Sequence, residues 1–184
     1  MTASKHTTPL VIPPLDSNVS ADTETIGSTV VSTGNAVTVD LGTTIALDDG
    51  GTAVWCQMAS AVGQYNGVVI SSNFRASNLT TTNVDQGDGG ISSQIGWAQT
   101  SIAVSNQGWI HTSGRPIAEL AANCGNQNVL FTTATAGVLD DATVSAAMVA
   151  GAKLKIGATS VSNATARTLI VPVGAMILPM GGST

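Results

Sequence analysis

From residue 29 onward, short runs of apolar or alternating residues are separated by turn signals roughly every ten residues. The run Val37–Leu41 alternates apolar and polar side chains, a period of two that predicts a strand with one buried face. The turn signal Asp48–Gly51 separates Thr43–Leu47 from Thr52–Ala59, so these two runs are predicted to form a β-hairpin. Many short strands at this spacing are typical of an all-β sandwich or barrel.

Further strands are expected at Val68–Ile70, Ile95–Trp97, Ile102–Val104, Trp109–Thr112, Ile117–Leu120, Val129–Thr132, Val138–Leu139, Lys153–Ile156 and Leu169–Val173. The run Val144–Ala150 favours one short helix, because Ala and Met are good helix formers. No regular repeat is evident in the sequence, which argues against a solenoid. The predicted fold is therefore all-β, a sandwich or barrel of short antiparallel strands with an extended N-terminal arm and at most one short helix.

The side chains available for the outer surface explain why helices are not expected. Only 9% of the residues are charged, where about 25% is typical of soluble domains. Surface helices take their outer face mainly from Glu, Lys, Arg and Gln, and the chain has only two Glu and three Lys. Its 24 Thr and 19 Val favour strands instead. A neutral face suits close contact with other subunits, because few charges must be desolvated. The alternative is a soluble β-protein that is simply rich in Thr.

Residues 1–20 are predicted to form an extended arm, and residues 21–184 one β-rich domain. Pro9, Pro13 and Pro14 fix φ and push the residues before them into extended conformations. The side chains beside these prolines are apolar, at Leu10, Val11, Ile12 and Leu15. Such a strap needs an apolar surface on its own domain or on a neighbouring subunit; the alternative is a frayed terminus. Within the domain, a long polar loop is predicted near 75–92.

Charge and cysteine usage argue against several classes of function. The net charge is −5 and the few Lys and Arg are scattered, whereas nucleic-acid binding needs clustered cations. No apolar stretch approaches the roughly 20 residues that span a bilayer. The N-terminus also lacks the apolar core of a signal peptide. Without a secretory signal, Cys56 and Cys124 are interpreted as buried small apolar residues rather than as a disulfide.

The inventory of groups for catalysis is small. His6 lies in the predicted arm, which leaves His111 as the only plausible general base of its type. Cys56 lies in a predicted apolar strand, and Cys124 lies in a predicted loop where its thiol could be exposed. Neither cysteine has a basic neighbour in the sequence to activate it as a nucleophile. We therefore predict no enzymatic activity and no cofactor.

No metal site is predicted either. Zinc sites need clustered Cys and His, and the sequence has no such cluster. Asp85 and Asp88 offer oxygen ligands for calcium, but their spacing matches no standard calcium-binding loop. The adjacent pairs Asp48-Asp49 and Asp140-Asp141 are more simply turn formers than the carboxylates of a glycosidase.

Three stretches of the second half carry a resemblance to a known family. Gly108–Arg115 (GWIHTSGR) is a Gly-Trp strand followed by a Ser-Gly turn. Ala121–Asn123 and Val129–Asp141 add an Ala-rich strand and a Thr-Ala-Gly-Val turn with a further strand. This order resembles the capsid decoration (cement) proteins of tailed bacteriophages, over about residues 95–175. His111 lies two residues after Trp109, so both should share one strand face, where we interpret them as packing or interface residues.

The resemblance implies a β-rich structural module on the outer surface of a phage head, made in the host cytoplasm and assembled into the virion. It implies binding to neighbouring major capsid protein subunits, self-association as a homotrimer, and no catalytic residues. The alternatives are another virion component, such as a tail or fibre protein, and a secreted β-rich adhesin or binding module. The predicted interface residues are Leu10, Val11, Ile12, Pro13, Pro14, Leu15, Trp109, His111 and Arg115.

Overall fold

The computed structural model describes residues 27–32, 35–81, 94–126, 128–142, 148–154, 165–171 and 176–178. Side chains are described within 39–81, 94–126 and 128–142 and at positions 169 and 171. Every regular element in these ranges is a β-strand, which confirms the predicted all-β class. The same ranges hold no helix that could cross a membrane.

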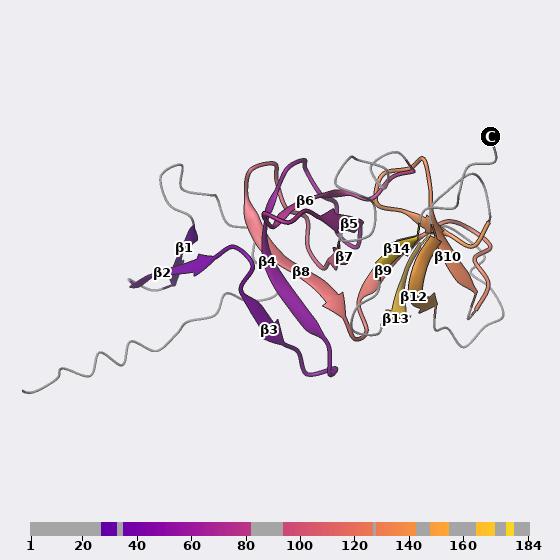
Figure 1. Ribbon diagram of the computed structural model, residues 1–184, viewed down its shortest axis with the longest axis horizontal. Helices are drawn as coiled ribbons and strands as arrows, with labels where there is room; N and C mark the ends of the chain where they lie inside the picture. The colour runs from indigo at the N-terminus through magenta and orange to yellow at the C-terminus, as the bar shows by residue number, and fades with distance from the viewer. Residues whose placement is uncertain are drawn as a thin grey trace, which may run out of the picture.

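Fourteen strands are described. In chain order they are β1 (Gly27–Ser32), β2 (Asn35–Asp40), β3 (Thr44–Ala46), β4 (Thr52–Met58), β5 (Gly67–Ile70), β6 (Arg75–Asn78), β7 (Gln94–Ala98), β8 (Gln107–Ser113), β9 (Ile117–Leu120), β10 (Val129–Thr132), β11 (Leu139–Asp140), β12 (Met148–Leu154), β13 (Thr165–Ile170) and β14 (Met176–Leu178). Strands β1 and β2 pair only with each other, as a hairpin that stands beside the body of the molecule (Figure 1).

Five strands of the first half close into a small barrel. Around the ring, β4 pairs with β8, β8 with β7, β7 with β5 and β5 with β6, all antiparallel. Strand β6 then returns to β4 in parallel and closes the ring. Strand β3 pairs with the start of β4, across the predicted hairpin turn Asp48–Gly51. A closed ring leaves few free strand edges, which are otherwise templates for unwanted pairing.

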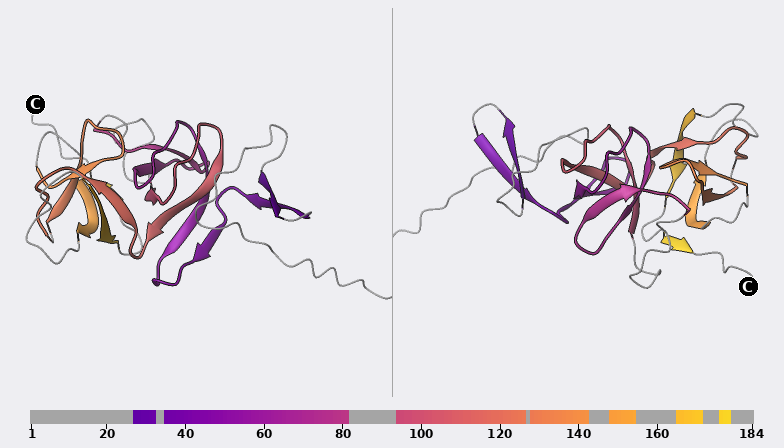
Figure 2. Two further views of the ribbon diagram at one scale, coloured as in Figure 1. Left: turned by 180° about the vertical axis from the view of Figure 1, so that it is seen from behind. Right: turned by 90° about the horizontal axis from the view of Figure 1, so that it is seen from above.

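Five strands of the second half close into another barrel. Strand β9 pairs with β13, β13 with β12, β12 with β10 and β10 with β11, again antiparallel. Strand β11 closes the ring by pairing with β9 in parallel. Strand β14 connects the two rings, because it pairs with both β12 and β7. The two barrels lie side by side along the molecule, the first in indigo to pink and the second in orange and yellow (Figures 1 and 2).

The two barrels are copies of one topology. Strands β9, β10, β11, β12 and β13 take the places of β4, β5, β6, β7 and β8, and all five pairings keep their direction. The registers also correspond. The parallel pair Met58↔Ala76 matches Leu120↔Leu139, and the antiparallel pair Ala98↔Ile110 matches Leu154↔Leu169. The fold is therefore an internal repeat, although the sequence shows none.

The interiors of the two barrels use matching positions. Six buried side chains of the first barrel have buried counterparts in the second, in the pairs Cys56/Ala118, Met58/Leu120, Val62/Cys124, Val68/Leu130, Ala76/Leu139 and Ile110/Leu169. Between 56 and 70 the counterpart lies 62 residues later in each case. When the fifteen residues 56–70 are compared with residues 118–132, only three positions keep the same amino acid, at Ala59/Ala121, Gly63/Gly125 and Asn66/Asn128. The six paired interior positions retain apolar character but not identity, whereas buried Ile70 has the polar Thr132 as its counterpart.

The barrels share one apolar interface. Leu79, Ile95 and Trp97 belong to the first barrel by sequence, yet they pack in one cluster with Leu120 and Leu139 of the second. All five side chains are at most 1% exposed. This cluster extends the interior of the second barrel onto the outer face of the first, whose own interior is a separate cluster, so the two barrels share an apolar contact but not one core.

Several sequence predictions need correction. The predicted antiparallel arrangement has two exceptions, the parallel pairs β4–β6 and β9–β11. The loop expected near 75–92 does not begin at Arg75, because Arg75–Asn78 is strand β6. The helix expected over Val144–Ala150 is wrong at its end, where Met148–Ala150 start β12 and pair with β14. Ile102 makes a single bridge with Val62 rather than a strand.

Other predictions lie outside the described residues. They are the arm at 1–20, the loop residues 82–93 with Asp85 and Asp88, and the helix positions 143–147.

Candidate functional site

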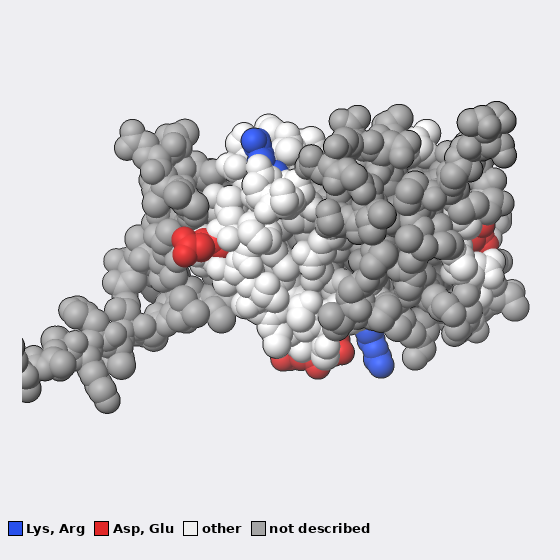
Figure 3. Space-filling view, in the orientation of Figure 1, with Lys and Arg blue, Asp and Glu red and all other residues white. Residues whose placement is uncertain are grey.

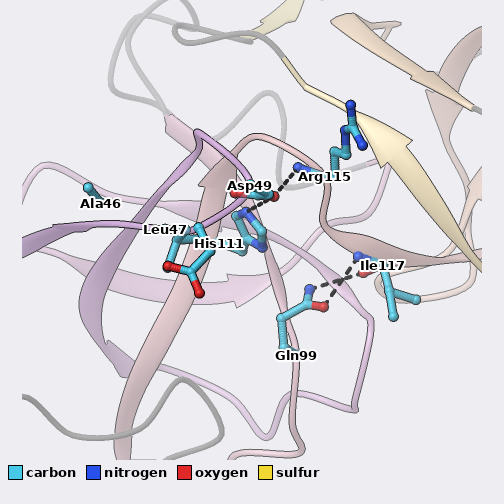
Figure 4. A pocket seen from close by; sticks show the side chains of 8 residues that line it. Ala46, Leu47, Asp49, Gln99, His111, Arg115 and Ile117 are labelled. Carbon is cyan, nitrogen blue, oxygen red and sulfur yellow. Dashed lines mark hydrogen bonds and ion pairs between the residues drawn. The ribbon is translucent and has the colours of Figure 1, made fainter.

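A pocket of about 450 Å³ lies where the β3–β4 turn meets the link between β8 and β9 (Figure 4). Its wall combines acidic, basic, amide and apolar side chains. The lining residues are Ala46, Leu47, Asp48, Asp49, Gln99, His111, Arg115 and Ile117. The pocket therefore joins the turn predicted from Asp48–Gly51 to residues more than 60 positions later in the chain.

Asp49 is held in place by backbone donors. Its Oδ1 accepts a hydrogen bond from the Gly51 N–H at 2.9 Å. Its Oδ2 accepts one from the Arg115 N–H, across 66 residues of sequence. Partial burial raises the pKa of Asp49, but the hydrogen bonds from Arg115 and Gly51 and the attraction of His111 outweigh it and leave the pKa below its ordinary value.

Two glycines allow the turns to approach. A Cβ on Gly51 would lie 1.9 Å from the carbonyl oxygen of Ser113. Gly114 has φ +99°, and a Cβ there would lie 2.6 Å from Asp49 Oδ2. Larger residues at either position would push the carboxylate of Asp49 away from β8. The Ser113-Gly114 turn thus reverses the chain and also lets Gly114 approach the carboxylate of Asp49 closely.

His111 is the buried polar group of this pocket. It lies in β8 opposite Trp97 of β7, and its side chain is 6% exposed. Its Nε2 lies 3.4 Å from Asp49 Oδ2 and has no hydrogen-bond partner among the described residues. Burial lowers the pKa of His111, opposed by the charge of Asp49 and by a backbone hydrogen bond with Ser113. The ring is therefore neutral at neutral pH.

The other polar groups of the pocket have defined roles. The Gln99 side-chain amide donates to the Ile117 carbonyl at 3.1 Å and accepts from the Ile117 N–H at 3.2 Å, in the manner of a neighbouring strand. Arg115 is exposed, and its guanidinium points away from the carboxylate of Asp49 (Figure 4). No Ser, Thr or Cys is among the lining residues, so His111 has no hydroxyl or thiol to activate within this pocket.

No protein-family model matches the chain, and no curated protein matches it. The residues brought together by the fold are thus the evidence on function.

The predicted interface residues that the structure describes do not all lie at the pocket. His111 and Arg115 both line the pocket. Trp109 is fully buried and packs edge-to-face on Trp55, with ring centroids 5.0 Å apart. Trp109 is therefore a core residue of the first barrel, and its prediction as an interface residue needs correction. Residues 10–15 lie outside the described residues.

A second cluster of ligand-type side chains lies in the second barrel. Potential metal-binding atoms of Cys124, Asp140 and Asp141 lie within 4.8 Å of one another. Cys124 is fully buried, which confirms the interpretation of the two cysteines as buried small apolar residues and excludes the exposure considered for this thiol. Burial raises the pKa of the Cys124 thiol to about 12, so the thiol is protonated at neutral pH in the metal-free protein.

A comparison with the first barrel shows the structural role of Asp141 in this cluster. There, Asn78 Oδ1 accepts from Asn66 Nδ2 at 3.1 Å and so fastens the turn before β5. In the second barrel, the counterpart of Asn78 is Asp141, which accepts from Asn128 Nδ2 at 2.7 Å and from the Gly125 N–H at 2.8 Å. Asp141 therefore performs a turn-fastening role that the first barrel fills with an amide.

Sequence reasoning found the parts of the pocket but not their assembly. Asp48-Asp49, His111 and Arg115 were each singled out, in separate roles. The contact between Asp49 and His111 depends on β4 pairing with β8, and no local pattern reports that pairing. Gln99 was missed, because its function is to hydrogen-bond the backbone of Ile117 on another strand.

Proposed function

We propose that this chain is a non-catalytic structural protein of a phage virion, which binds the outer surface of the head and stabilises contacts between major capsid subunits. The proposal rests on the surface rather than on the pocket. Of the 26 exposed side chains that the structure describes, only five are charged, and eight are alanine. The five charged residues are Asp40, Asp48, Asp49, Arg75 and Arg115.

A surface of this kind suits extensive protein contact. Burying a Lys, Arg or Glu side chain in an interface costs rotamer freedom and desolvation of the charge. Ala and Gly lose no rotamer freedom, and Ser, Thr and Asn lose little. The described part of the face in Figure 3 carries charge only as isolated spots. Such a face favours association through many small contacts, as expected of a clamp across subunit seams.

The two-barrel body supports the same proposal. Side by side, the barrels form an elongated body (Figure 1), long enough to contact more than one neighbour. We propose that the chain acts as a homotrimer and that residues 9–15 pack against a neighbouring subunit. Its location would be the capsid surface, with synthesis in the host cytoplasm.

Density-gradient purification of virions from the source tests the proposal. The chain should co-sediment with heads, in a fixed ratio to the major capsid protein. Deletion of residues 1–20 should reduce that occupancy. Light scattering of the purified protein should give three times the 18.4 kDa mass of one chain. A protein that is absent from particles and monomeric in solution would overturn the proposal.

A further inference from the structure

The internal repeat singles out His111 as a residue that the fold itself does not require. In the β7–β8 pair His111 faces Trp97, and in the matching β12–β13 pair Ile170 faces Lys153. The same barrel position is thus occupied by isoleucine in the second copy. A buried histidine costs stability unless both ring nitrogens find partners. Its presence in the first barrel therefore points to a role other than packing.

The Nε2 atom of His111 is the buried polar atom that the fold leaves without a hydrogen bond. It has no such partner among the described residues, and it lies 3.4 Å from Asp49 Oδ2. A neutral imidazole nitrogen and a carboxylate oxygen are both metal-ligand atoms, so the pair offers two ligands side by side on the pocket wall.

The distance between His111 Nε2 and Asp49 Oδ2 suits some cations better than others. Ligands about 2.1 Å from a tetrahedral zinc ion lie about 3.4 Å apart, which matches the observed separation of 3.4 Å. An ammonium group hydrogen-bonded at about 2.8 Å would need acceptors about 4.6 Å apart to keep tetrahedral angles. The spacing therefore fits a metal ion better than the side chain of a lysine.

The surrounding contacts orient both donors. Asp49 is positioned by the Gly51 and Arg115 N–H groups, and the Arg115 guanidinium is turned away from it (Figure 4). His111 is held in β8, where it pairs with Ala53 of β4 and Trp97 of β7. Hydrogen bonds to a ligating carboxylate orient it in metal sites.

We propose that His111 Nε2 and Asp49 Oδ2 bind a divalent transition-metal ion, with zinc as the best fit, at the wall of the pocket. The remaining coordination positions are filled by water from the pocket. The pocket provides the space, and Asp48 adds a second negative charge beside it. The Cys124–Asp140–Asp141 cluster is a separate group of ligand-type atoms, and the Cys124→Ala variant distinguishes it from the proposed site.

The test is titration of the full-length, chelator-treated protein with zinc chloride by calorimetry, and with cobalt chloride by visible absorption. We expect one ion per chain and the intense absorption of tetrahedral cobalt. His111→Ile, which copies the second barrel, and Asp49→Asn should each weaken binding at least about tenfold. His6→Gln and Cys124→Ala, which remove the other histidine and the other candidate ligand, should bind as the parent does.

Either of two results would overturn the site. One is the absence of zinc binding by the parent protein. The other is binding that survives both His111→Ile and Asp49→Asn, or that is lost in His6→Gln or Cys124→Ala, because the ion would then lie elsewhere. Circular dichroism of each variant shows whether it is folded, and Asp49→Asn decides alone if His111→Ile does not fold.

Discussion

At the scale of single residues, the two thiols lie one in each barrel interior. Cys56 and Cys124 are both fully buried and free, and burial raises the pKa of each to about 12. A thiol needs both access and ionisation to react. We expect neither cysteine to react with iodoacetamide or a disulfide reagent at pH 8 until the barrel that contains it opens. Full labelling under native conditions within minutes, at the rate of a denatured control, would contradict this.

Asp141 allows a direct exchange between the two copies of the barrel. Asp141→Asn turns the Asn128–Asp141 contact into the amide pair that Asn66 and Asn78 form in the first barrel. We expect urea unfolding at pH 7 to show a loss of about 1 kcal/mol or less, against about 2 kcal/mol for Asp141→Ala, which leaves Asn128 and the Gly125 N–H without their acceptor. Equal losses in the two variants would refute the turn-fastening role.

The pH dependence of the same substitution has a defined sign. Partial burial raises the pKa of Asp141, but hydrogen bonds from Gly125 and Asn128 outweigh it and hold the pKa below the ordinary value of 3.8. A depressed carboxyl pKa stabilises the folded state above that ordinary value, and the contribution is lost as the pH falls through the depressed one. The stability difference between the parent and Asp141→Asn should therefore shift in favour of the variant between pH 5 and pH 2. A difference that stays constant over this range would contradict the assignment.

At the scale of elements, the β3–β4 turn holds two glycines that are needed for different reasons, Gly50 for its positive φ and Gly51 for a close backbone contact. Gly50 has φ +80° with no atom within 4 Å of an added Cβ, so Gly50→Ala should cost only backbone strain, about 1 kcal/mol. Gly51→Ala would drive its Cβ into the Ser113 carbonyl and should cost about 3 kcal/mol. Urea unfolding of the two variants measures both losses. If Gly50→Ala proves the more damaging, the close approach of the two turns is not as described.

Strand propensity and turn chemistry explain which elements the sequence could predict. The hairpin at Asp48–Gly51 and the strands Ile117–Leu120 and Val129–Thr132 follow from local patterns, and they are present as expected. Arg75–Asn78 has a polar sequence, so it was assigned to a loop, yet β5 on one side and β4 on the other recruit it as a strand. Met148–Ala150 was assigned to a helix on propensity, and pairing with β14 decides otherwise.

At the scale of the whole molecule, the duplication could not be predicted from the sequence. Burial constrains the character of residues such as Met58 and Leu120, and volume-conserving exchanges there leave no shared identity to detect. Ring closure by the parallel pairs β4–β6 and β9–β11 is likewise invisible to local periodicity. The candidate site was hidden for the same reason. His111 was interpreted from the sequence as a packing or interface residue, and only its counterpart Ile170 shows that the barrel does not require a histidine there.

The duplication raises the question of whether each barrel is stable alone, and Trp97 allows a test. Its side chain is 0% exposed and packs where the outer face of the first barrel meets the interior of the second. Trp97→Ala should therefore cost about 4 kcal/mol and destabilise both barrels together. Thiol labelling in denaturant reports on each barrel separately, through Cys56 in the Cys124→Ala variant and through Cys124 in the Cys56→Ala variant. Both thiols should become reactive at the same denaturant concentration. Adding Trp97→Ala should lower that concentration equally for both. Val104→Ala, at a position that is 54% exposed, serves as the control and should move neither probe. Separate midpoints for the two thiols would mean that the barrels unfold independently and that the shared cluster does not couple them.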